Sequence, residues 1–131
     1  MDDRTRTGSA ETAADPGSVV GLLADAGRLP AWAPAFADAV TSAGGSRWRA
    51  VKDGRDFELR AAVNLDAGTV DYLREIAPGR EGGAYLRVVP RPGGGSVVII
   101  TLPVPPGADP AAVASTLENE LSALKDLAEG G

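Results

Sequence analysis

The stretch DPAAVASTLENELSALKDLA, residues 109–128, decides the fold of this chain. Asp109 suits the cap of a helix, and Pro110 suits its first helical position. Large apolar residues then recur at helical spacing, at Val113, Leu117, Leu121, Leu124 and Leu127. The pattern predicts one long amphipathic helix that ends at Gly130-Gly131, and its apolar stripe must pack against another apolar surface.

The chain before this helix supplies that surface as short segments separated by glycine and proline turns. We predict strands over residues 4–13, 36–42, 48–52, 57–63, 69–76, 83–89 and 96–102. Two short helices, over 15–27 and 29–35, follow the first strand. Because the later strands follow one another through short turns, they should pair as an antiparallel meander.

Two segments carry the strongest strand signals. Phe57 to Val63 alternates with a period of two, and it follows Asp53-Gly54, a typical two-residue hairpin turn. Val97 to Leu102 is apolar on both faces, which indicates a strand with a neighbour on each side. The predicted fold class is α+β: a seven-stranded curved antiparallel sheet with the long C-terminal helix across its concave face.

Composition limits the possible functions. The 131 residues predict a single domain, 1–131, with 44% hydrophobic and 24% charged residues, as in soluble globular proteins. A net charge of -5 without a basic patch disfavours nucleic-acid binding. No apolar run is long enough for membrane insertion, and no signal-like segment follows Met1, so we expect a cytoplasmic protein.

The chain has no cysteine and no histidine. Disulfides, thiolate metal sites and a cysteine nucleophile are thereby excluded. The commonest general base and the commonest transition-metal ligand are missing too. We therefore expect no metal, no cofactor and no catalytic residue that the spacing alone would single out.

The segment Asp15–Phe36 resembles the START-like superfamily, also called SRPBCC, which includes plant pathogenesis-related and polyketide cyclase/dehydrase-like proteins. The stretch DPGSVVGLLAD, from Asp15, is similar to the first helix of that family. The stretch RLPAWAP, from Arg28, is similar to its recurrent leucine-proline-x-tryptophan segment. The resemblance implies the helix-grip fold and, as functions, ligand binding, cyclisation or chaperone activation.

A bent sheet that grips a straight helix leaves space between the two, and such a space is a natural ligand cavity. The side chains expected to line it come from the concave face, the second short helix and the last helix. They are Trp32, Phe36, Trp48, Phe57, Leu59, Tyr72, Arg74, Leu86, Leu117 and Leu121. For Trp32 two interpretations stay open, a structural anchor or a lid at the cavity edge, and in both it is buried near one end of the last helix.

Arg74 is the one charged residue on the face of Val70, Tyr72 and Ile76. A guanidinium beside a cavity needs an anionic partner, either on a ligand or on a protein carboxylate such as Glu118 or Glu120. The alternative is that Arg74 points into water.

Three functions are compatible with these expectations. The first is binding of a hydrophobic small molecule, apolar or aromatic and lipid- or polyketide-like, between the sheet and the last helix. The second is a polyketide cyclase or dehydratase, which rests on the family resemblance. The third is an interaction module or homodimer, in which Val98 and Ile100 would form an apolar patch on the outer face of the sheet.

Overall fold

The computed structural model describes residues 4–130 and has the predicted α+β architecture. The first strand and the helical segments after it are β1 (Thr5–Thr12), α1 (Pro16–Ala24), the 3-10 turn η1 (Ala26–Arg28) and α2 (Leu29–Trp32). The remaining strands are β2 (Ala39–Gly44), β3 (Arg47–Lys52), β4 (Arg55–Asn64), β5 (Thr69–Ala77), β6 (Arg80–Pro90) and β7 (Ser96–Pro103). The chain ends with α3 (Pro110–Gly130).

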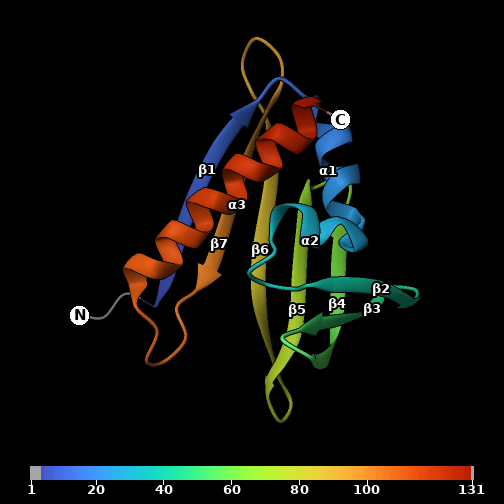
Figure 1. Cartoon of the computed structure of the whole chain (residues 1–131). Coiled ribbons are helices and arrows are strands. Elements are labelled where there is room, and N and C mark those ends of the chain that lie inside the picture. Colours follow the sequence, from blue (N-terminus) through green and yellow to red (C-terminus); the bar gives the residue numbers. More distant parts are fainter. Residues whose placement is uncertain (1–3, 131) are drawn as a thin grey trace.

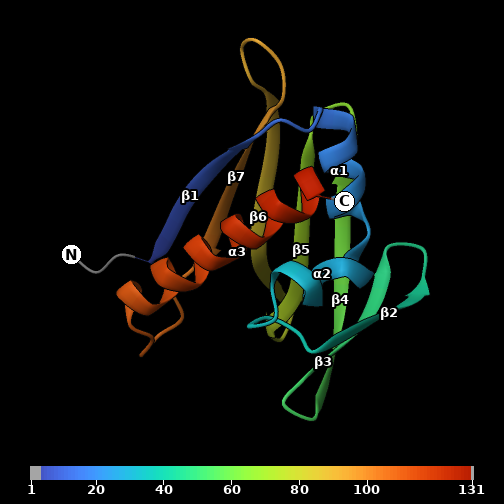
Figure 2. The ribbon, with the colours of Figure 1, turned by 45° about the horizontal axis from the view of Figure 1, so that its top comes forward.

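The seven strands form one antiparallel sheet in the order β1-β7-β6-β5-β4-β3-β2. Strands β2 to β7 form a meander, as predicted. Strand β1 pairs with β7 and forms one edge of the sheet. The doubly apolar strand β7 therefore has a neighbour on each side, which confirms its predicted internal position. Helix α3 crosses one face of the sheet, and α1 and α2 lie on the same side of it (Figures 1 and 2).

One strand begins later than the sequence predicted. Residues 36 and 37 belong to a turn, because the Ala33 carbonyl accepts hydrogen bonds from the backbone N–H groups of Phe36 and Ala37. The strand β2 consequently starts at Ala39. The Asp53-Gly54 turn has the expected backbone, with φ of 51° and 78°, a conformation that aspartate and glycine tolerate well.

Helix α3 docks on the sheet through the predicted apolar stripe. Leu117, Leu121 and Leu124 are buried. The helix packs tightly on β1 at Gly8, where an added Cβ would lie 3.0 Å from Leu121 Cδ1 and 3.1 Å from Leu117 Cδ2. The missing side chain at Gly8 thus sets how closely α3 approaches this edge of the sheet.

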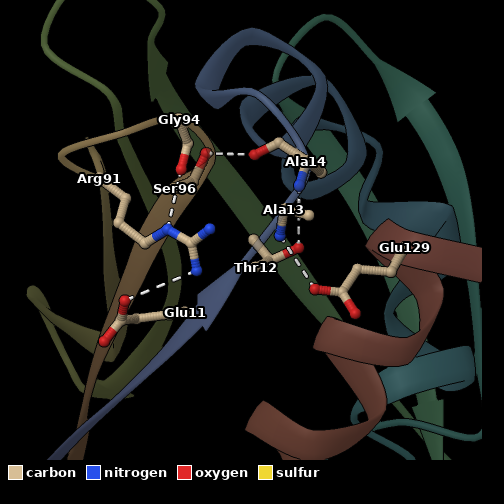
Figure 3. A network of polar contacts seen from close by, with 8 residues as sticks. All are labelled: Glu11, Thr12, Ala13, Ala14, Arg91, Gly94, Ser96 and Glu129. Atoms are coloured by element: carbon tan, nitrogen blue, oxygen red, sulfur yellow. Dashed lines mark hydrogen bonds and ion pairs between the residues drawn. The ribbon is translucent and has the colours of Figure 1, made fainter.

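Polar contacts fix the C-terminal end of α3 to the segment between β1 and α1 (Figure 3). The Glu129 carboxylate accepts a hydrogen bond of 2.9 Å from the Ala13 N–H, which lowers the pKa of Glu129 below its usual value. Ser96 Oγ donates to the Ala14 carbonyl at 2.7 Å and joins β7 to the same segment. This end of the helix is therefore held to the sheet by hydrogen bonds as well as by apolar packing.

The sheet divides beyond the middle of β5. Strands β4 and β5 pair from Asn64 and Thr69 as far as Arg60 and Leu73. The first half of β4 then pairs with β3, and the last residues of β5 pair with β6. As a result β2 and β3 turn away from the direction of β5 and β6 (Figure 1).

Candidate functional site

A small cavity of about 30 Å³ lies between the sheet and α3. Its walls come from α2 and the turn after it, from β5, β6 and β7, and from the middle of α3. They are formed by Leu29, Trp32, Ala33, Phe36, Tyr72, Ala84, Ile100, Leu102 and Glu120. A volume of this size has room for one or two water molecules or for one functional group of a larger ligand.

The cavity adjoins an open groove of about 360 Å³ beside the first half of α3. Phe36, Leu102 and Glu120 border both spaces. The rest of the groove is formed by the turn after α2, the proline-rich segment before α3 and the first turns of that helix. The residues are Ala35, Pro103, Pro105, Ala108, Asp109, Ala112, Val113 and Thr116. The two spaces therefore share part of their walls.

Trp32 forms one wall of the cavity. Only 3% of this residue is exposed, which confirms its predicted burial, and its ring centroid lies 6.2 Å from that of Tyr72. It shares the cavity with Glu120, at the middle of α3, so it lies beside the centre of that helix and not near an end as predicted. The buried indole Nε1 makes no hydrogen bond within residues 4–130. An N–H group in this state can donate to a ligand.

Tyr72 closes the cavity from the sheet side with its ring. Its hydroxyl group donates a hydrogen bond to the Leu23 carbonyl of α1, and burial raises the pKa of Tyr72 above its usual value. Because the hydroxyl is already engaged with α1, the part of Tyr72 that faces the cavity is apolar.

Glu120 is the acidic residue of the cavity wall. Only 6% of it is exposed, and burial raises the pKa of its carboxyl group to about 7. Within residues 4–130 no ion pair involves this carboxyl group. The sequence contained a signal for its position, because Glu120 lies three residues after Leu117 and four before Leu124 and so shares their face of the helix.

The structure brings together only part of the predicted cavity lining. Trp32, Phe36 and Tyr72 meet at the cavity. Four leucines belong to the core instead. Leu59, Leu86, Leu117 and Leu121 are buried, and none of them lines this cavity. Leu121 borders a separate void of about 10 Å³ beneath the second half of α3. Trp48 and Phe57 are half-buried on β3 and β4 and do not line the cavity, although the Phe57 ring packs edge-on against Phe36, with 5.6 Å between the ring centroids.

Arg74 is exposed and does not border the cavity. Its guanidinium lies 4.0 Å from the centre of the Phe57 ring, in the open wedge between the diverging strands β4 and β5. Among the described residues no ion pair joins Arg74 to a carboxylate. The register of β5 places it on the face of Tyr72, but the strand has by then separated from β4, so a cation–π contact takes the place of the expected anionic partner.

The predicted outward patch of Val98 and Ile100 is wrong. Both are buried, with 3% and 1% exposed, and Ile100 borders the cavity under α3. The alternate residues of β7, Val97 and Ile99, take the outer face, where they are half-buried. The strand is apolar on both faces, so the sequence alone left the choice of face open.

Two further features bear on the kind of site. Over residues 4–130, no cluster of three or more acidic side chains could hold a metal ion. Within the same part of the chain, no helix is long and apolar enough to cross a membrane. Among the residues that border the cavity, Trp32 and Glu120 carry a polar group that makes no hydrogen bond or ion pair within residues 4–130, whereas the Tyr72 hydroxyl is bonded to Leu23.

A seven-stranded antiparallel sheet with two short helices after its first strand and a long C-terminal helix across it defines the helix-grip fold. Solved structures share this fold over nearly the whole chain. A START superfamily protein from Mycobacterium smegmatis has a TM-score of 0.72 and 15% sequence identity, and the match covers 96% of this chain and 97% of that one.

Two other neighbours extend the comparison. The di-domain ARO/CYC StfQ, from the steffimycin biosynthetic pathway, has a TM-score of 0.69 and 17% identity over 95% of this chain and 45% of its own. Ara h 8.0201 has a TM-score of 0.59 and 16% identity over 95% and 96% of the two chains. No protein-family model and no curated protein matches the sequence. At these identities the likeness concerns the fold.

Proposed function

We propose that the protein binds a hydrophobic small molecule between the sheet and α3, with its ring system in the groove and one group in the cavity. The observation that carries the proposal is that Phe36, Leu102 and Glu120 border both spaces. Most of the lining is apolar, and such concave sites with a few polar groups are typical of small-molecule binding.

The dimensions favour a compact ligand. A cavity of about 30 Å³ has no room for an acyl chain, whereas the groove of about 360 Å³ can receive one or two fused rings. A flat aromatic molecule can contact the Phe36 ring and Leu102 at the boundary between the two spaces. Within the expected range of lipid- and polyketide-like ligands, the geometry supports the aromatic ones. The fold shared with StfQ, an ARO/CYC protein of the steffimycin biosynthetic pathway, is in keeping with this choice.

Equilibrium dialysis with naphthalene tests the proposal, because its two fused rings match the groove and carry no polar group. Ala112 borders the groove, and Ala111 is an exposed neighbour on the same helix turn that does not. Ala112→Phe should therefore lower naphthalene binding at least tenfold, and the matched Ala111→Phe should leave it unchanged. Undetectable binding to the unmodified protein, or equal binding to both variants, would refute the proposed site.

A second function, proton transfer on a bound carbonyl compound, is favoured by one observation. Burial raises the pKa of Glu120 to about 7, which suits a general acid or base at neutral pH. Such a group would support the chemistry of a cyclase or dehydratase. Turnover of a poly-β-keto substrate that is abolished in Glu120→Gln, with binding retained, would establish this activity, and turnover unaffected by that change would exclude Glu120 from it.

A further inference from the structure

Two residues of the cavity wall, Trp32 and Glu120, carry polar groups of opposite hydrogen-bonding character. Trp32 Nε1 is a donor that is buried without a partner in the described part of the chain, and Glu120 offers carboxyl oxygens as acceptors. Both residues border the same volume of about 30 Å³, so a group bound there lies against both side chains. A buried polar group without a partner costs free energy, and a ligand that satisfies it gains that energy on binding.

Resting on the proposed function above, we infer that the site selects neutral aromatic alcohols, phenols and enols, whose hydroxyl group enters the cavity. The hydroxyl oxygen accepts a hydrogen bond from Trp32 Nε1, and its hydrogen is donated to the Glu120 carboxyl group. A hydroxyl is the smallest organic group that accepts and donates at one atom, and it fits the volume. The ring that carries it lies in the groove against Phe36 and Leu102.

The charges around the site exclude other ligand classes. The charged residues that border the cavity and the groove are Glu120 and Asp109, and both are acidic. A carboxylate or phosphate ligand would meet negative charge with no cation among the lining residues to compensate it. An ammonium group would pair with Glu120 but has no lone pair to accept from Trp32 Nε1. An ether accepts from the indole but has no hydrogen to donate to the ionised Glu120 carboxylate.

Four probes of one ring system separate these cases in equilibrium dialysis at one pH: naphthalene, 1-naphthol, 1-methoxynaphthalene and 1-naphthoate. We expect 1-naphthol to bind about tenfold or more tightly than naphthalene, since a site built to bond a hydroxyl discriminates against the analogue that lacks it. The ether should gain less than the phenol, and the carboxylate should bind more weakly than naphthalene. Equal affinities for naphthalene and 1-naphthol would overturn the inference, as when buried water already serves both groups.

Three variants locate the effect. Trp32→Phe removes the indole N–H, and Glu120→Met replaces the carboxyl group by an apolar side chain of similar length. Each should reduce the ratio of 1-naphthol to naphthalene affinity several-fold, with naphthalene affinity reporting on whether the site remains formed. Ser115→Ala, which removes a hydroxyl from the exposed side of α3 outside both spaces, should leave the ratio unchanged. An unaltered ratio in both Trp32→Phe and Glu120→Met would refute the assignment. If none of the four probes binds the unmodified protein, the proposed function itself fails.

Discussion

The rings of Trp32 and Tyr72 lie 6.2 Å apart between centroids and are tilted by 44° to one another. The hydroxyl of Tyr72 bonds the Leu23 carbonyl, so the pair links α2, the sheet and α1. Trp32→Ala should lower the free energy of unfolding by roughly 3–5 kcal/mol, as for other buried aromatic residues. Denaturant unfolding measures this. A loss below about 1 kcal/mol together with a large change in ligand release rate would instead support the lid interpretation.

Tyr72→Phe tests the polar half of that linkage. The change keeps the ring contact with Trp32 and removes the buried hydrogen bond to α1, so stability should fall by roughly 1–3 kcal/mol. Tyr85 is 45% exposed on the outer face, and Tyr85→Phe is the matched control, with an expected change within about 0.5 kcal/mol. Equal effects in the two variants would show that the hydrogen bond to Leu23 contributes little.

The packing of α3 can be tested with three alanine substitutions. Leu117→Ala and Leu121→Ala should each cost roughly 2–5 kcal/mol, because both side chains are buried against the sheet. Ser122 is exposed on the opposite side, so Ser122→Ala should change stability by about 0.5 kcal/mol or less. Thermal and denaturant unfolding should agree on this order. Small and equal effects at all three positions would contradict the docking of the helix.

Glu120 predicts a pH-dependent stability. Its pKa is 4.5 in an ordinary environment and about 7 in the folded protein, so the folded state binds its proton more tightly than the unfolded state does. The resulting stabilisation is fully present below pH 4.5 and is lost as the pH rises through about 7.

Glu120→Gln should remove this dependence. The variant should resemble the unmodified protein at pH 4 and exceed its unfolding free energy by roughly 3 kcal/mol at pH 8, since one pKa unit corresponds to about 1.4 kcal/mol. Denaturant midpoints measured from pH 4 to pH 8 give both curves. Parallel curves would mean that the carboxyl group is solvated in the folded protein.

The sequence predicted the fold well because its signals are local. Asp109-Pro110 starts α3, glycine turns separate the strands, and Asp53-Gly54 forms its hairpin. The position of Phe36 was missed because two hydrogen bonds to Ala33 extend the turn after α2, and no local pattern reports them. The approach of α3 at Gly8 was also not predicted, since it depends on a contact between residues more than 100 positions apart.

The site was harder to predict than the fold. The sequence supplied Trp32, Phe36 and Tyr72, which are aromatic residues on elements that were correctly placed. It gave Arg74 the polar role, because it could not show that β5 separates from β4 beyond Leu73. Glu120 lies on the apolar face of α3 and is buried. From the sequence alone, a carboxylate beside leucines is expected at the exposed edge of such a face, because its burial depends on the residues that pack opposite it.

The pairing of β1 with β7 has a consequence for the order in which the chain folds. Thr12 pairs with Ser96, and Thr5 pairs with Pro103, so the first strand in the sequence pairs with the last one. While the chain is made from its N-terminus, β2 to β6 can pair in succession, but β1 has no partner until Ser96–Pro103 has been synthesised. High contact order of this kind slows folding to roughly the millisecond-to-second range. We therefore expect the contact of α3 with Gly8, and the cavity under α3, to form only after β1 has paired with β7.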